Sequence, residues 1–148
     1  MYRHILIATD GSELAEHAVT AGLSLAKSVG AKATVIVVIE LWLGSQGPFM
    51  QPWSFQQLGE YNELAKKQAA SVLERAKNAA KQAGVTCDTI QVEEVQPSYQ
   101  VIITTAADRG CDLIVMGSHG RSGLAAVVLG SVTNKVLTHT KIPVLVVR

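Results

Sequence analysis

Residues 113–131 read LIVMGSHGRSGLAAVVLGS, and this stretch decides both the expected fold and the expected site. It opens with the apolar run Leu113–Met116, which is typical of a strand buried on both faces. Three glycines, two serines, a histidine and an arginine follow in residues 117–123. Glycine lets the backbone approach a ligand closely, so that amide N–H groups converge on an anion. Gly130-Ser131 then begins a helix, whose first N–H groups also suit a phosphate.

Outward from this stretch, apolar strands alternate with amphipathic helices along the chain. Strands are expected at Ile5–Ala8, Ala33–Ile39, Thr89–Val95 (a mixed-polarity edge strand), Asp112–Met116 and Ile142–Val147. Helices are expected at Ala15–Val29, Gln57–Ala83, Ser98 up to Gly110, and Ser131–His139, the last with Val132, Val136 and Leu137 inward. The alternation predicts an α/β fold: a five-stranded parallel, doubly wound (Rossmann-like) sheet, order 3-2-1-4-5, with helices on both faces.

In such a sheet ligands bind beyond the carboxyl ends of the strands, where the strand order reverses. The loops that would meet there follow the first and fourth strands, at Thr9–Ser12 and Gly117–Gly123. We therefore expect both loops to contribute to one site.

Composition limits the classes of function. A chain of 148 residues predicts one domain, 1–148, and 13 basic against 12 acidic residues without a basic block do not favour a nucleic-acid partner. Apolar runs fall short of the ~20 residues that span a bilayer, and no signal-peptide pattern is present, so a cytoplasmic protein without membrane insertion is expected. Cys87 and Cys111 are expected to be reduced, largely buried thiols. The scattered histidines do not predict a zinc site.

Two familiar phosphate motifs are absent. No Gly-x-x-x-x-Gly-Lys-Ser/Thr run occurs, and the first strand is followed by Asp10-Gly11-Ser12 instead of Gly-x-Gly-x-x-Gly. Glu40 stands where a dinucleotide fold places its ribose-binding acid, a weak signal without those glycines. No aspartate ends the third strand, which excludes a phospho-accepting response regulator.

The pattern that is present is Gly117-x-x-Gly120, nine residues, then Gly130-Ser131. With Ile7–Ser12, Asp112–Gly120 and the closing Ile142–Val147, it resembles the universal stress protein family. The resemblance covers the chain apart from Leu41–Phe55. It implies a role in stress resistance, and the complete glycine pattern is that of the family's ATP-binding members.

The resemblance also implies where the nucleoside would lie. Asp10 would contact the ribose or base region, with Ala8 and Thr9 lining the pocket. Val38 would meet the adenine, and Met116–Gly117 would flank the nucleoside. For Asp10, an ordinary turn or helix N-cap is the alternative role.

At the phosphate end, His119 and Gly120 would lie along the phosphates. Gly130–Val132 would hold the distal phosphates through backbone amides and the Ser131 hydroxyl, with Mg²⁺ or Mn²⁺ bound through the phosphates of ATP (or AMP or ADP). Arg121 either neutralises phosphate or faces solvent or a partner. The alternatives are ordinary turn chemistry for the glycines, a helix cap for Ser131 and a structural contact for His119.

Three functions remain open from sequence. The leading one is a regulatory ATP-binding homodimer joined through the final strand, Ile142–Val147, whose apolar edge invites pairing with its copy. The second is a slow ATPase or autophosphorylating phosphotransferase with Ser122 or Ser131 as acceptor, although the loop offers no lysine and no clear base. The third is an interaction protein that binds no nucleotide. The aromatic Leu41–Phe55 segment is either a flap over the core or a surface for a client protein.

Overall fold

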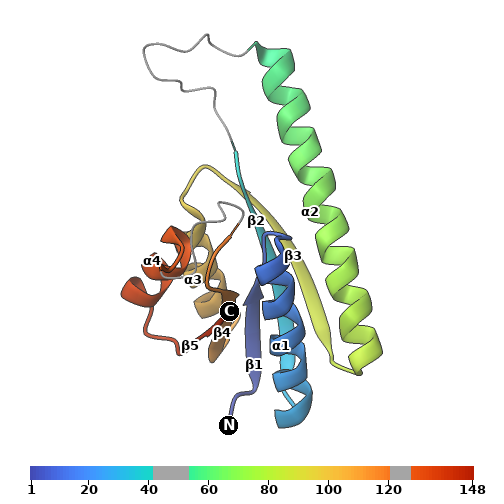
Figure 1. Cartoon of the computed structure of the whole chain (residues 1–148), viewed down its shortest axis with the longest axis vertical. Helices are drawn as coiled ribbons and strands as arrows, with labels where there is room; N and C mark the ends of the chain where they lie inside the picture. Colours follow the sequence, from blue (N-terminus) through green and yellow to red (C-terminus); the bar gives the residue numbers. More distant parts are fainter. Residues whose placement is uncertain (42–53, 121–127) are drawn as a thin grey trace.

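The computed structural model describes residues 1–41, 54–120 and 128–148. In these ranges the elements are β1 (His4–Ala8), α1 (Glu13–Val29), β2 (Lys32–Glu40), α2 (Phe55–Ala83), β3 (Cys87–Glu94), α3 (Ser98–Asp108), β4 (Leu113–Gly117), α4 (Ser131–His139) and β5 (Val144–Val147). The strands form one parallel sheet in the order β3-β2-β1-β4-β5 (Figure 1). The predicted fold class, strand order and edge position of β3 are confirmed.

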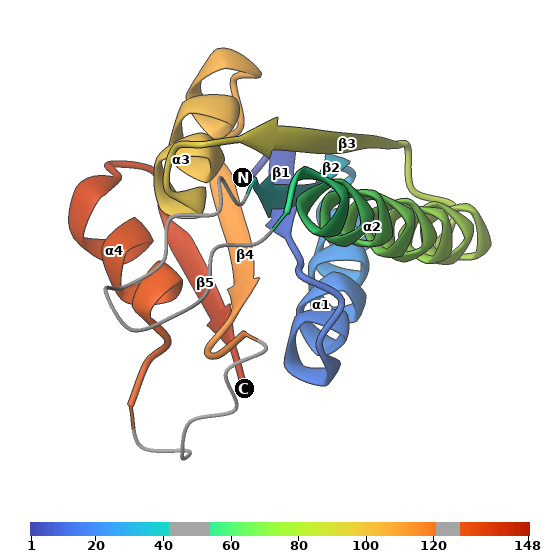
Figure 2. The same ribbon diagram turned by 90° about the horizontal axis from the view of Figure 1, so that it is seen from above.

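The sheet separates two apolar cores. Helices α1 and α2 cover one face, and α3 and α4 cover the other (Figure 2). Successive strand residues point to opposite faces, so Ile5 and Ile7 pack against α1 and α2 while Leu6 and Ala8 pack on the other side. Every residue of β1 and of β4 is buried, which explains why β4 and the part of β1 after His4 read as apolar runs.

Local signals determine where the two long helices begin and end. The Ser12 side chain caps α1, and a capping box between Ser54 and Gln57 begins α2. Both helices end at glycines in the left-handed region, Gly30 with φ 69° and Gly84 with φ 71°, as the sequence predicts. Helix α2 begins at Phe55, two residues before the predicted Gln57.

The prediction that Leu137 faces inward is wrong, because this side chain is 40% exposed. Helix α4 instead buries Val136 and Thr133, and it packs Val132 partly against the second core. Leu137 is rotated about 100° from Val136 around the helix axis, which carries it off the buried face. Strand β5 begins at Val144, later than the predicted Ile142.

A buried polar cluster closes the amino end of the sheet. The His4 side chain, only 5% exposed, donates from Nδ1 to the Arg109 carbonyl and accepts at Nε2 from the Thr34 hydroxyl. Burial lowers the pKa of His4, and the nearby Lys32 charge lowers it further. The Asp112 carboxylate accepts from the backbone N–H groups of Arg3 and His4. Burial alone would raise the pKa of Asp112, but these hydrogen bonds hold it below its ordinary value.

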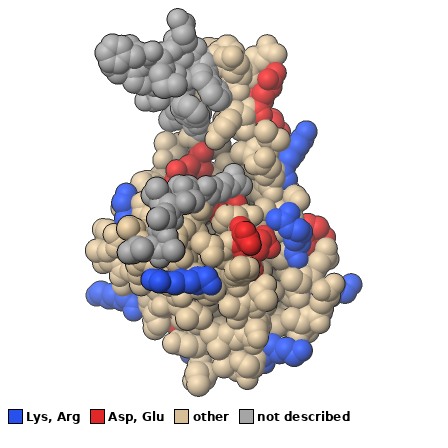
Figure 3. Space-filling model, in the orientation of Figure 1, with Lys and Arg blue, Asp and Glu red and all other residues tan. Residues whose placement is uncertain are grey.

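The mixed surface charge agrees with the small net charge of the chain. Basic and acidic side chains are interspersed over the described part of the face in Figure 3. Both Cys87 and Cys111 are free thiols, and burial raises the pKa of Cys111 to about 11. Among the helices of the described ranges, none has the length and apolarity needed to cross a bilayer.

Candidate functional site

A cavity of about 390 Å³ opens at the carboxyl ends of β1, β2 and β4, within the size range of small-molecule sites. Most of the residues expected from the sequence to surround a ligand line this cavity. They are Ala8, Thr9, Asp10, Val38, Met116, Gly117, His119, Gly120, Gly130, Ser131 and Val132. The remaining one, Arg121, lies outside the described residues, as does most of Leu41–Phe55.

Unequal strand lengths create a step at one end of the cavity. Strand β1 ends at Ala8, where it pairs with Ile36, whereas β2 continues to Glu40. The Thr9 N–H still donates to the Ile36 carbonyl at 3.0 Å. N–H and C=O groups of alternate residues in a parallel strand point to the same side. The backbone groups of Val38 therefore face the space beyond β1, where no described strand continues the ladder.

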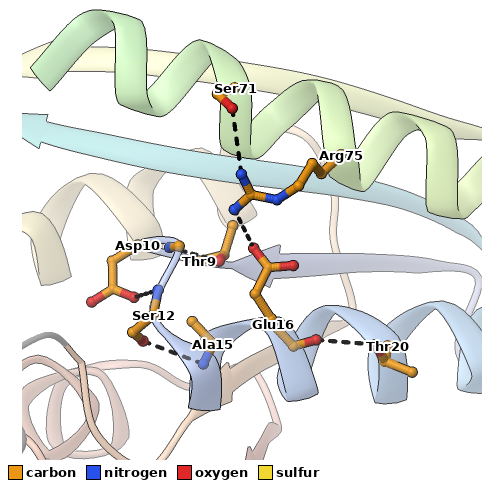
Figure 4. A network of polar contacts seen from close by, with 9 residues as sticks. Thr9, Asp10, Ser12, Ala15, Glu16, Thr20, Ser71 and Arg75 are labelled. Atoms are coloured by element: carbon orange, nitrogen blue, oxygen red, sulfur yellow. Dashed lines mark hydrogen bonds and ion pairs between the residues drawn. The ribbon is translucent and has the colours of Figure 1, made fainter. Parts of the chain in front are cut away.

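The loop after β1 is held by its own polar groups (Figure 4). The Asp10 Oδ1 accepts from the Ser12 N–H at 2.9 Å, and the Thr9 hydroxyl oxygen accepts from the Gly11 N–H at 3.2 Å. Gly11 has φ 79°, and a Cβ there would lie 2.5 Å from a methyl carbon of Val72. This loop needs glycine both for its conformation and for the close approach of α2.

Helix α2 is tied to α1 beside this loop. Arg75 donates to the Glu16 carboxylate at 3.2 Å and to the Ser71 hydroxyl at 3.3 Å, as Figure 4 shows. The pair is half exposed, so it contributes less than about 1 kcal/mol to stability. Its main effect is to hold the two helices in register above the first loop.

The glycines of the second loop allow close backbone approach. The Gly130 N–H donates to the Ser118 carbonyl at 2.7 Å, and a Cβ on Gly130 would lie 3.2 Å from that oxygen. A Cβ on Gly120 would lie 2.6 Å from the Asp10 Oδ2. A side chain at position 120 would therefore collide with the Asp10 carboxylate. The two predicted loops meet as expected.

Three helices begin at the cavity, and their first turns differ. In α1, Ser12 caps the helix and Asp10 accepts from the Ser12 N–H. In α3, the Glu40 Oε1 accepts from both the backbone N–H and the hydroxyl of Ser98, at 2.9 and 2.6 Å. Carboxylates therefore already occupy both of these positive helix ends.

Within the described residues, the first turn of α4 has no such partner. It begins at Gly130 without a side-chain cap, and Ser131, Val132 and Thr133 all line the cavity. The first N–H groups of a helix have no partner within it, so they are available to an anion. The Thr133 hydroxyl donates instead to the Gly117 carbonyl at 2.8 Å, which fixes this helix start to the end of β4. Within the described ranges, no group of three metal-ligating side chains gathers.

A buried imidazole lies beside this helix start. His119 is 7% exposed, and its Nδ1 lies 3.0 Å from the Ser118 Oγ. Its Nε2 is buried and has no hydrogen-bond partner among the described residues. An orphaned buried polar group costs about 1–3 kcal/mol, so its presence in the wall of a cavity points to a missing polar ligand.

Sequence reasoning missed several residues of the cavity wall. The sequence indicates Glu40 only as a weak signal for a ribose-binding acid, and no local pattern signals its pairing with Ser98, 58 positions away in the chain. Tyr61 and Ala65 reach the cavity from α2, where the sequence indicated only an apolar helix face. Ser118, which lies behind the lining residue His119, belongs to the glycine-rich loop, but no sequence pattern indicates that its hydroxyl bonds the His119 ring.

Comparison with known proteins identifies the family. The model of the "Universal stress protein family" matches residues 1–148. The chain belongs to this family. The universal stress protein YxiE of Bacillus subtilis is 34% identical over 152 residues, covering 100% of both chains.

Solved structures of the family share this architecture. The structure of MJ0577, a universal stress protein of Methanocaldococcus jannaschii, has a TM-score of 0.80 and 30% identity, covering 99% of this chain and 96% of that one. A universal stress protein solved in complex with cAMP has a TM-score of 0.71 and 25% identity, covering 99% and 97%. A member of the family therefore binds an adenine nucleotide.

Proposed function

We propose that this chain binds an adenine nucleotide, ATP or its products AMP and ADP, in the cavity at the end of β4, and that it acts as a regulatory module of the stress response. The observation that carries this proposal is the uncapped first turn of α4 beside the orphaned His119 Nε2. A phosphate satisfies both sets of groups at once. The cAMP complex of a family member supports the adenine nucleotide as the ligand class.

The base is assigned to the other end of the cavity, at Val38. A strand residue that presents its N–H and C=O on one side offers a donor next to an acceptor. The Watson–Crick edge of adenine carries the complementary pair, a ring nitrogen acceptor beside an amino donor. Guanine has the donor and the acceptor in the reverse order, so Val38 would favour adenine over guanine when the ribose contacts fix the orientation of the base.

The nucleoside and phosphates would lie between these two ends. Ala8, Thr9 and Asp10 stand beside the ribose region, with Met116 and Gly117 across from them. The amides of Ser131 and Val132 and the Ser131 hydroxyl would hold the phosphates, because the Gly130 N–H already donates to the Ser118 carbonyl. Mg²⁺ or Mn²⁺ would bind through the phosphate oxygens. A bound divalent ion supplies charge neutralisation, which the described part of the loop does not provide through a lysine.

Calorimetry with Mg-ATP on nucleotide-stripped protein tests the proposal. Saturable binding is expected for the native chain, and Gly130→Val should abolish it because a side chain there meets the Ser118 carbonyl and His119 backbone. Gly59→Val is the matched control, since a Cβ at Gly59 meets no atom of the described residues within 4 Å. Absence of binding in the native chain, or equal binding in both variants, contradicts the proposal. Mass spectrometry of the purified protein offers an independent check through co-purified nucleotide.

We also propose that two copies pair through β5. This strand is the edge of the sheet, and Leu145 is 39% exposed there. An unpaired apolar edge favours pairing with an identical strand of a second copy.

A further inference from the structure

Ser118 and His119 form a polar pair beside the cavity, and His119 lines it. Both residues are buried, at 2% and 7% exposed. The backbone of Ser118 is fixed on both sides, because its N–H donates to the Val147 carbonyl and its C=O accepts from the Gly130 N–H. In the described part of the chain, the Ser118 hydroxyl has one hydrogen-bond partner, the Nδ1 of His119.

This isolation determines which atom donates. A hydroxyl has one proton, and neutral imidazole has one N–H and one lone-pair nitrogen. If Nδ1 carried the ring proton, the Ser118 hydroxyl proton would be buried with no acceptor. If the hydroxyl donates to Nδ1, its proton and the Nδ1 lone pair are both paired, and the ring proton resides on Nε2. Among the described residues, the first arrangement leaves both the hydroxyl proton and the Nε2 lone pair without a partner, whereas the second leaves only the Nε2–H, which a ligand in the cavity can accept.

His4 provides an internal contrast. Its Nδ1 faces the Arg109 carbonyl, which can only accept, so the ring proton of His4 resides on Nδ1. The Thr34 hydroxyl then donates to its Nε2 at 2.8 Å. The two ends of the sheet thus hold buried histidines in opposite tautomers, determined by a backbone carbonyl at His4 and by a hydroxyl at His119.

We infer that Ser118 is a positioning residue that keeps the proton on His119 Nε2, and that this N–H donates to the anionic group of the ligand at the first turn of α4. The identity of that ligand as a nucleotide rests on the proposed function. Phosphate oxygens only accept, so the opposite tautomer would direct a lone pair at the anion and repel it. The Ser118 hydroxyl therefore makes the neutral His119 ring a hydrogen-bond donor to an anion.

Long-range ¹H–¹⁵N spectra of the labelled full chain read the ring tautomers directly. We expect the Nε2–H form for His119 and the Nδ1–H form for His4 in the native chain. Ser118→Ala should convert His119 to a mixture of tautomers and leave His4 unchanged, whereas the control Ser28→Ala, whose hydroxyl bonds the Leu25 carbonyl, should change neither. An Nδ1–H form of His119 in the native chain, or an unchanged ring in Ser118→Ala, overturns the inference.

Titration with AMP, adenosine and inorganic pyrophosphate completes the test. AMP should shift the His119 Nε2–H resonance, and Ser118→Ala should weaken AMP about tenfold while leaving adenosine unaffected, since a charged hydrogen bond is lost. If AMP binds without shifting that resonance, the inference fails and the proposed function stands. If AMP does not bind, the proposed function fails, and pyrophosphate decides: a shifted resonance supports the anion contact and an unshifted one overturns it.

Discussion

At the scale of single residues, the site depends on atoms that side chains leave uncovered. Gly120 has no Cβ where the Asp10 carboxylate lies, and Gly130 has none where the Ser118 carbonyl lies. The two contacts differ in kind. A carboxylate at the end of a side chain can rotate away, whereas a backbone carbonyl in a paired loop cannot. Substitutions at the two glycines therefore separate binding from folding.

Gly120→Ala should weaken nucleotide binding about tenfold with little loss of stability. The new Cβ displaces the Asp10 Oδ2, which lies 2.6 Å away, and a displaced contact of roughly 1.4 kcal/mol corresponds to that factor. Gly130→Ala should lower both affinity and the free energy of unfolding, because its Cβ meets backbone atoms. Calorimetry and urea denaturation of the two variants measure the difference. Equal loss of stability in both would refute the distinction.

His4 should make stability depend on pH. Its folded pKa lies below the unfolded value of 6.5, so the unfolded chain takes up the proton first and stability falls as pH drops below 6.5. The slope approaches about 1.4 kcal/mol per pH unit for one proton. His4→Gln should remove this slope in denaturation measured from pH 8 to 5.5, whereas the exposed His17→Gln should keep it. The lowered pKa of Asp112 acts separately, as pH falls toward and below 3.8.

At the scale of elements, the two helices on one face of the sheet differ in how closely they pack. Gly22 brings α1 against β1 and β4: a Cβ there would lie 2.7 Å from Ile7 Cδ1 and 3.5 Å from Val115 Cβ. Near the start of α2, a Cβ on Gly59 meets nothing within 4 Å. The same residue type thus serves close packing in one helix and lies in an exposed turn of the other.

The substitution of alanine at these two glycines should have opposite effects. Gly22→Ala should lower the free energy of unfolding by about 1–3 kcal/mol, because crowding of the core exceeds the gain in helix propensity. Gly59→Ala should raise it by about 0.5–1 kcal/mol, because only the propensity term remains. Thermal and urea unfolding of the pair provide the measurement. A stabilised Gly22→Ala would show that α1 can move away from the sheet.

Most of this architecture could be predicted because it is encoded locally. The apolar runs of β1 and β4, the period of α1 and the glycines Gly30 and Gly84 each act within a few residues of their position in the chain. What could not be predicted depends on long-range geometry. The exposure of Leu137 follows from how much of α4 the sheet covers, and the Glu40–Ser98 pair from how β2 passes α3. The inferred tautomer of His119 depends on its hydrogen bond with the buried Ser118 hydroxyl.

At the scale of the whole molecule, the alternation of bonding directions in β5 makes the proposed dimer testable. The Ser118 N–H donates to the Val147 carbonyl, and the Ile114 N–H to the Pro143 carbonyl. Odd-numbered residues of β5 therefore bond to β4, and even-numbered ones point outward from the sheet. The outward N–H of Val146 is available to a second copy.

Val146→Pro should convert the dimer to a monomer without unfolding it. Proline removes only an outward-facing N–H, a position that edge strands tolerate. Leu145→Pro, which removes a bond to β4, should instead lower thermal stability. Sedimentation velocity and thermal unfolding of both variants separate the outcomes. A dimer that survives Val146→Pro would assign the pairing to another surface.

The step between β1 and β2 has a consequence for how this site can change over time. The donor and the acceptor in this recess are the backbone N–H and C=O of Val38. Side chains around Val38 can therefore be substituted while these two groups remain. A change in chain length acts differently. Two residues inserted after Ala8 would let β1 pair onward along β2 and fill the recess. Recognition of the base would then withstand many point mutations and be lost through one short insertion.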